Sequence, residues 1–288
     1  TGLYKYMPAS FIRLADPSLD RNDEMRLAWY AGHDGFALQQ QLPNLIMRMI
    51  EHLGVTRAAF VGGSGGGFAA LYYSWHIPQS VAIVLNPQTN LNKYHWGHRR
   101  RYREVCWPFL DAKAPLDSVV DVNLCPLYAG RFDNTVICIQ IASDYFHLTR
   151  QFAPFVAALP AEHRERLIVR VANWGVKGHK PAPTAIWIPW IVAALSAPDT
   201  TAESIEATWA AQNPFELPPL KRLPSYTRPS AAIDAAVEKI LAEQAASPQA
   251  APKPIPPATS RDEQIAMELA GLAFGTLLGE PSSGEQAP

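Results

Sequence analysis

A glycine-rich segment restricts the possible folds of this chain more than any other feature. Residues 61–67 read Val-Gly-Gly-Ser-Gly-Gly-Gly. The apolar run at 57–61 predicts a buried strand, and the helical pattern at 68–76 ends before Pro78. Glycine adopts backbone conformations that other residues avoid. The segment therefore predicts a sharp turn that leads from a buried strand into a helix.

Short β-rich runs alternate with helical patterns over the first 196 residues. We predict strands at residues 10–15, 26–31, 57–61, 81–85, 135–142 and 167–172, and helices at 40–53, 68–76, 151–159 and 187–195. Such alternation is typical of a mostly parallel sheet that is flanked by helices. The continuously apolar run at 81–85 fits a strand that is buried on both faces. The predicted fold class is therefore α/β.

The composition turns to alanine, proline, glutamate and serine at about residue 197. We predict one α/β catalytic domain at 1–196 and an Ala/Pro-rich tail at 197–288. The tail carries helical patterns at 231–246 and 261–278, which are candidate docking segments for a protein partner or for the protein's own body. The proline-rich stretch between them predicts an extended linker, and the last ten residues are expected to be disordered.

A formal net charge of −1 gives no electrostatic reason to expect nucleic acid as a partner. The one basic cluster, at residues 98–103, predicts a solvated face, with a contact to an anionic substrate or partner as the alternative. No apolar run reaches the roughly 18 residues of a membrane span, so we expect no transmembrane segment.

The three cysteines are odd in number and lack Cys-x-x-Cys spacing, which argues against a disulfide framework and against a zinc site. This favours a reducing compartment. No leader pattern follows Thr1. We therefore expect a cytoplasmic location.

Three glycine motifs compete for residues 62–67. A phosphate-binding loop needs a lysine after its last glycine, and Phe68 stands there instead. A dinucleotide-binding pattern fails as well, because Phe68 or Ser64 occupies a position that must be glycine. Gly-x-Ser-x-Gly fits at residues 62–66. Its glycines allow the strained turn that exposes the serine beside a helix N-terminus, where developing negative charge is stabilised.

This motif and its strand-turn-helix context resemble the nucleophile elbow of the α/β-hydrolase superfamily, over about residues 10–196. In that family the serine, the acid and the histidine follow one another in this order. The resemblance implies Ser64 as the nucleophile. Asp144, which follows one predicted strand, is then the orienting acid, and His179, which follows the last, is the general base and acid. The imidazole takes the serine proton, and the carboxylate fixes the imidazole tautomer.

Three further residues are candidates for lining the pocket. His147 follows the predicted acid closely, Gly63 precedes the serine, and His33 follows a predicted strand within Gly-His-Asp-Gly, with a polar turn as its alternative role. Asp121 and Asp133 precede a strand and would lie at its wrong end.

No metal site and no organic cofactor are expected. The chemistry of an activated serine needs neither. The histidines without companions at metal-ligand spacing are His76, His95, His98 and His163.

A tetrahedral intermediate formed on the serine needs hydrogen-bond donors for its oxyanion. The resemblance assigns the backbone N–H of Gly65 as one donor. The second normally comes from a loop after an earlier strand, often with a His-Gly pair, and no such pair precedes Ser64. Either a strand upstream of Thr1 supplies it, so that the chain lacks the first strands of the fold, or the loop at 32–35 takes over this role.

Four segments are similar to bacterial hydrolase-like domains linked to cell-surface glycans and accessory glycoprotein secretion. They are Gly-Gly-Ser-Gly-Gly-Gly-Phe-Ala-Ala-Leu at 62–71, Asn-Pro-Gln-Thr at 86–89, Asp144-x-x-His147 and Gly178-His179-x-Pro181. The resemblance implies transfer of acyl groups onto sugars, or their removal. We therefore expect a serine esterase or acyltransferase acting on a small-molecule or glycan ester. The alternative is a catalytically weak or inactive accessory module that binds a cell-surface glycan or a secretion partner.

Overall fold

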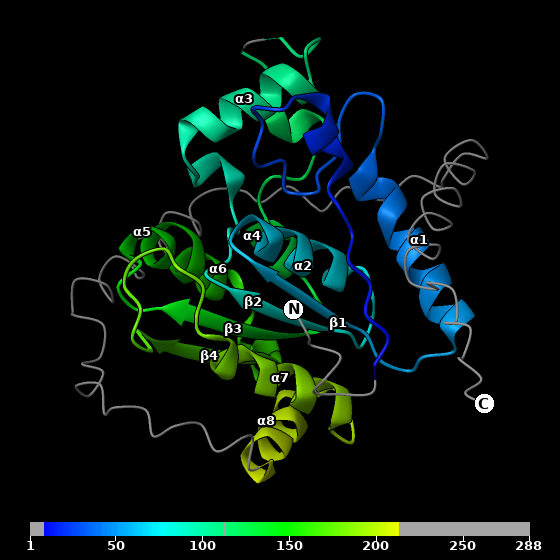
Figure 1. Ribbon diagram of the computed structural model, residues 1–288, viewed down its shortest axis with the longest axis vertical. Coiled ribbons are helices and arrows are strands. Elements are labelled where there is room, and N and C mark those ends of the chain that lie inside the picture. Colours follow the sequence, from blue (N-terminus) through cyan, green and yellow to red (C-terminus); the bar gives the residue numbers. More distant parts are fainter. Residues whose placement is uncertain (1–8, 112, 213–288) are drawn as a thin grey trace, which may run out of the picture.

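The computed structural model describes residues 9–111 and 113–212 and contains a sheet of four parallel strands (Figure 1). The strands lie side by side in the order β1 (Ala59–Gly63), β2 (Val81–Leu85), β3 (Thr135–Ile141) and β4 (Leu167–Ala172). Within the described residues, β1 forms one edge of the sheet and pairs with β2 alone. The predicted α/β class, with a mostly parallel sheet flanked by helices, is confirmed.

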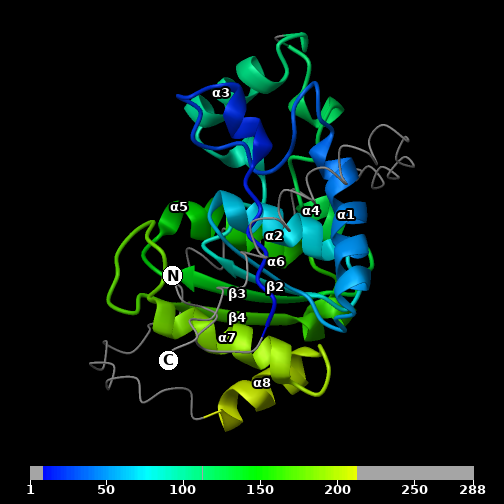
Figure 2. The ribbon, with the colours of Figure 1, turned by 45° about the vertical axis from the view of Figure 1, so that its right-hand side comes forward.

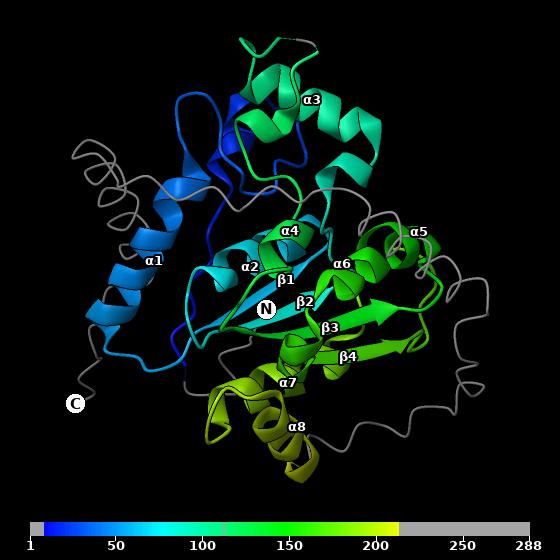
Figure 3. The same cartoon turned by 180° about the vertical axis from the view of Figure 1, so that it is seen from behind.

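Helices form a layer on each face of the sheet (Figures 2 and 3). One layer contains α1 (Leu38–Leu53), α2 (Gly65–Trp75), α4 (Cys125–Tyr128) and α6 (Ala153–Ala158), and the other contains α7 (Thr184–Ser196) and α8 (Ala202–Ala211). No helix in the described part of the chain is both long and apolar enough to span a bilayer.

The central strands β2 and β3 are buried at every position, which explains why their sequences are continuously apolar. Successive side chains point to opposite faces of a sheet, so each strand serves two cores. Val84 and Cys138 contribute to the core under α2, whereas Ile83 and Ile137 pack in a second core with Trp190 of α7.

Residues 16–37 and α3 (Trp96–Cys106) pack together beyond the sheet, at the top of Figure 1. Tyr102 of α3 donates a hydrogen bond of 2.8 Å to the carbonyl oxygen of Gly32. Arg101 pairs with Glu24 at 2.9 Å. We refer to residues 16–37 together with α3 as the cap.

The strands predicted at 10–15 and 26–31 do not form, so this part of the prediction is wrong. The backbone of Trp29 and of Tyr30 has a φ of 56°, which is incompatible with an extended strand. The Trp29 side chain is 1% exposed and packs edge-on against Tyr102 of the cap. Trp29 of the second run therefore belongs to the core of the cap, whereas Phe11 of the first run packs against the core under α7, and neither run adds a strand to the sheet.

The folded helices continue past the predicted domain boundary at 196/197. Ile205 of α8 is fully buried, and the indole rings of Trp209 and Trp190 stack at 4.6 Å. The short helix α5 (Tyr145–His147) leads through a π-helical turn at Leu148–Phe152 into α6. The predicted tail helices at 231–246 and 261–278 lie outside the described residues.

All three cysteines are buried and free. Burial raises the pKa of the Cys106 and Cys125 thiols to about 12. Such thiols stay protonated and behave as small apolar core residues.

Candidate active site

The turn between β1 and α2 has the strained geometry that the sequence predicts. Ser64 lies there with φ 54° and ψ −118°, a conformation that non-glycine residues rarely adopt. Its backbone is held from the neighbouring strand: the Ser64 N–H donates to the Leu85 carbonyl at 2.9 Å, and the Ser64 carbonyl accepts from the Gln88 N–H at 3.1 Å. The serine side chain is thereby fixed at the carboxyl edge of the sheet.

The glycines of this turn differ in how strictly they are needed. A Cβ at Gly62 would lie 2.0 Å from the Gly66 carbonyl oxygen, and one at Gly67 would lie 2.9 Å from Cβ of Pro87. A Cβ at Gly66 would meet nothing within 4 Å. The turn therefore requires glycine at 62 and 67 for lack of space, but not at 66.

Three side chains from three strand ends form one hydrogen-bonded row. His179 Nε2 lies 2.9 Å from Ser64 Oγ, and His179 Nδ1 lies 2.7 Å from Asp144 Oδ2. Asp144 caps α5 directly after β3, and His179 lies in the loop after β4. The structure thus brings together the serine, the acid and the histidine that were inferred from the sequence.

The loop that carries His179 is tied to the sheet by Asn86 at the end of β2. The Asn86 side chain donates to the Lys180 carbonyl at 2.8 Å and accepts from the Ile141 N–H at 2.7 Å. The His179 side chain is 40% exposed, so its Nε2 edge is open to a substrate. A clamped backbone with an accessible ring suits a group that must pass protons between a serine and a substrate.

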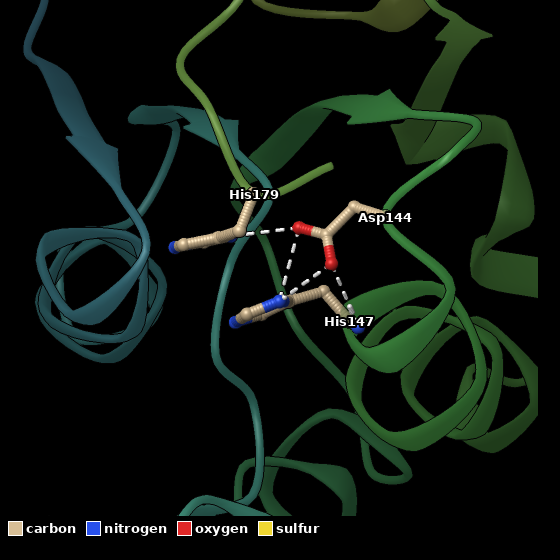
Figure 4. Close-up of side chains that lie close together, drawn as sticks. All are labelled: Asp144, His147 and His179. Atoms are coloured by element: carbon tan, nitrogen blue, oxygen red, sulfur yellow. Dashed lines mark hydrogen bonds and ion pairs between the residues drawn. The ribbon is translucent and has the colours of Figure 1, made fainter. Parts of the chain in front are cut away.

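His147 shares the carboxylate of Asp144 with His179 (Figure 4). Its Nδ1 lies 3.0 Å from Asp144 Oδ1, and its ring stacks on that of His179 with centroids 4.0 Å apart. His147 is 2% exposed, and its Nε2 has no hydrogen-bond partner among the described residues. The residue that was predicted to line the pocket therefore packs against the His179 ring and bonds to Asp144.

The two histidines also set the charge state of Asp144. Burial alone would raise its pKa, but the hydrogen bonds from His147 and His179 outweigh this effect and hold the pKa well below the ordinary value of 3.8. An ionised Asp144 accepts from Nδ1–H of His179, which leaves Nε2 free to accept the serine proton.

Asp144, His147 and His179 also have the donor atoms of a metal site, all within 4.8 Å of one another. The Nδ1 atoms of both imidazoles already face the carboxylate oxygens. A cation bound there would compete with the hydrogen bond that joins Asp144 to His179. The same three residues can therefore orient the base or bind a metal ion, but not both at once.

Gln88 is a residue of this site that the sequence analysis did not single out. Its side chain is fully buried, and its Nε2 donates to Ser64 Oγ at 2.9 Å. Its Oε1 accepts a hydrogen bond from the indole N–H of Trp29 in the cap. Functional side chains commonly follow the carboxyl ends of parallel strands. The position of Gln88 just after β2 was the signal that could have revealed it.

Two other candidates lie away from this row. The His33 ring accepts from the Gly35 N–H at 3.1 Å, and among the described residues its contacts stay within its own turn and the cap. This matches the polar turn that was weighed as its alternative role. Gly63 ends β1 opposite Leu85, and a Cβ there would come no closer than 3.6 Å to that residue's carbonyl oxygen.

A pocket of about 410 Å³ lies between residues 24–27 of the cap and the start of α3, where His95, His98 and Arg101 line it. Leu27 lines this pocket and also covers Gly65, since a Cβ on that glycine would lie 2.3 Å from Cδ1 of Leu27. Leu27 therefore lies between this pocket and the residue that follows the serine.

Comparisons of this chain with the models of known protein families, with curated proteins and with solved structures found no match.

Proposed function

We propose that this protein is a serine hydrolase or acyltransferase of the α/β-hydrolase type, which acts on an ester through an acyl-serine intermediate. One observation carries the proposal: Ser64 Oγ, His179 and Asp144 form a continuous row, with 2.9 Å and 2.7 Å between successive polar atoms. A serine hydroxyl is a weak nucleophile unless an oriented imidazole accepts its proton. This row provides both the imidazole and the carboxylate that orients it.

In the proposed first half-reaction, Ser64 Oγ attacks the ester carbonyl carbon while its proton passes to His179 Nε2. The resulting oxyanion is stabilised by the Gly65 N–H, which begins α2 and has no acceptor within that helix. The intermediate collapses as the C–O bond to the alcohol breaks, and His179 returns the proton to the leaving oxygen. An acyl group then remains on Ser64.

In the second half-reaction, His179 removes a proton from the acceptor hydroxyl as this oxygen attacks the carbonyl carbon of the acyl-serine. The bond between that carbon and Ser64 Oγ then breaks, and His179 returns the proton to Oγ, which restores the free serine. Water as the acceptor gives an acid, and a sugar hydroxyl gives a new ester. The choice of an acylated glycan as substrate rests on the similarity of residues 62–71 and 86–89 to glycan-linked hydrolase-like domains.

The alternative is a catalytically weak or inactive accessory module for a cell-surface glycan or a secretion partner. An inactive module has no need to keep Ser64 in a strained conformation or to keep Asp144 ionised and buried. Both features favour the enzyme.

A fluorophosphonate probe, which forms a covalent bond with activated serines, tests the proposal. We expect the protein to be labelled at Ser64, with labelling lost in Ser64→Ala and retained in Ser118→Ala, which removes an exposed serine of the surface. Peptide mapping identifies the modified residue. A folded wild-type protein that is not labelled would overturn the proposal, as would labelling that persists in Ser64→Ala.

A further inference from the structure

We propose that the side-chain amide of Gln88 is the second donor of the oxyanion hole, and that Trp29 of the cap holds it in the donating orientation. This inference rests on the proposed function, because it assigns a role within the same reaction. It supplies the donor for which the sequence offers no His-Gly loop.

The orientation of the amide follows from the chemistry of its two partners. An indole N–H is a donor only, so Trp29 must face the oxygen of the Gln88 amide. The NH₂ group then faces Ser64 Oγ, at 2.9 Å. The reverse orientation would place the NH₂ group against the indole N–H and leave both buried donors without an acceptor. Trp29 therefore selects the orientation in which Gln88 donates toward the reacting atoms.

The position of the amide also suits an oxyanion. In the tetrahedral intermediate, the oxyanion and Ser64 Oγ are bonded to the same carbon atom, so a donor beside Oγ is also near the oxyanion. One hydrogen of the NH₂ group lies toward Ser64 Oγ and the amide also contacts the Tyr94 hydroxyl, so the hydrogen that faces Oγ is the one that shifts to the adjacent oxyanion when Oγ becomes bonded to carbon. The Gly65 N–H approaches from α2, whereas Gln88 approaches from the end of β2. The two donors thus come from different elements around the serine.

The loop that carries Gln88 is held by several hydrogen bonds, which suits the preorganised donors that stabilise a transition state. The Gln88 backbone N–H donates to the Ser64 carbonyl at 3.1 Å. The backbone N–H groups of Thr89 and Asn90 both donate to the buried side chain of Gln151, each at 2.8 Å. The amide therefore needs little reorganisation when charge develops.

A rival role for Gln88 is to position the serine hydroxyl and nothing more. The two roles differ in the second half-reaction. The serine hydroxyl no longer exists in the acyl-enzyme, so a residue that only positions it affects acylation alone. An oxyanion donor acts on both tetrahedral intermediates and therefore on acylation and deacylation alike.

Stopped-flow hydrolysis of p-nitrophenyl acetate separates the two steps. The rate of the initial burst of p-nitrophenol reports acylation, and the later steady rate reports deacylation. We expect Gln88→Met, which keeps the approximate shape but removes the donor, to slow both acylation and deacylation by about 100-fold or more. Trp29→Phe keeps Gln88 but frees its amide to rotate, and should slow the same two steps by a smaller factor. Gln39→Met is the matched control, because the buried Gln39 side chain of α1 donates to the carbonyl and accepts from the N–H of Asp121, away from Ser64.

Slowing of acylation alone, or no change in either step, would overturn the inference while Ser64 labelling still supports the hydrolase. If Gln88→Met does not fold, Trp29→Phe decides between the same outcomes. A wild-type protein that gives neither a burst nor fluorophosphonate labelling would overturn the proposed function, and the role of Gln88 with it.

Discussion

The carboxylate of Asp144 lies within hydrogen-bonding distance of two histidines, His147 and His179. A Ser-His-Asp arrangement needs only one histidine. His147 Nδ1 lies 3.0 Å from each oxygen of the carboxylate, and this second contact helps to hold the carboxylate toward His179. The stacked rings also exclude solvent from one side of the His179 imidazole. These contacts explain how an acid with 4% exposure remains ionised.

Asp144→Asn tests the orienting role at the residue scale. The amide cannot accept and hold Nδ1–H of His179 as a carboxylate does, so the wrong tautomer forms. We expect kcat on an activated ester to fall by about 10⁴-fold, the size of loss seen when the acid of such a row is replaced. Ester hydrolysis under saturating substrate measures this. A loss of less than tenfold would contradict the assignment.

The same variant gives a prediction about pH and stability. The pKa of Asp144 in the folded protein lies below 3.8, so its ionisation favours the folded state. This contribution is fully present above pH 3.8 and is lost as the pH falls from there through the folded-state pKa. Urea unfolding at several pH values should therefore show the wild type more stable than Asp144→Asn near neutral pH, with a difference that shrinks below pH 3.8. A difference that grows on acidification would contradict this.

At the scale of elements, the turn between β1 and α2 requires glycine at fewer positions than its sequence motif suggests. The Gly-x-Ser-x-Gly pattern treats Gly62 and Gly66 as equivalent. Of these two glycines, only Gly62 lacks room for a Cβ atom, because that atom would clash with the backbone of Gly66. A backbone atom cannot rotate aside as a side chain can.

Gly62→Ala and Gly66→Ala form a matched pair that tests this difference. We expect Gly62→Ala to displace the turn, destabilise the protein and abolish fluorophosphonate labelling. Gly66→Ala should retain labelling and change the free energy of unfolding by no more than about 1 kcal/mol, since alanine suits a helix better than glycine. Urea denaturation and labelling rates measure both effects. Equal behaviour of the two variants would show that the contact at Gly62 does not govern the turn.

At the scale of the whole molecule, each strand of the described sheet delivers one residue to the site. Ser64 follows β1, Gln88 follows β2, Asp144 follows β3 and His179 follows β4. Parallel strands end at the same edge, so one architecture brings all four together. The cap closes over this edge and contributes Trp29.

The folded unit extends through α8, beyond the boundary that composition suggested. We expect Ile205→Ala to reduce the free energy of unfolding by about 2–5 kcal/mol, because the fully buried side chain leaves a cavity against the sheet layer. Glu203→Ala, an exposed position on the same helix, should change it by about 0.5 kcal/mol or less. Equal effects in urea unfolding would indicate that α8 is not part of the cooperative unit.

The sequence alone determined the sheet, the turn and the order of the reactive residues. Strands such as Val81–Leu85 are recognisable because burial on both faces leaves no polar position. The turn at Ser64 is recognisable because few residues other than glycine fit beside it. Both features depend on residues that are close together along the chain, so the sequence pattern is enough to recognise them.

Only the tertiary structure decided the roles of the cap, Gln88 and His147. The apolar run at 26–31 has the composition of a strand, but tertiary packing imposes positive φ angles on Trp29 and Tyr30 and places the indole on Gln88. That hydrogen bond joins residues 59 positions apart, and the one from Gln88 to Ser64 joins residues 24 apart. His147 lies three residues from Asp144, yet its stacking on His179 spans two loops. Contacts between distant segments depend on how the chain folds in three dimensions. The residue pattern could therefore mark Gln88 by its position after a strand, but it could not reveal which residues Gln88 and His147 contact.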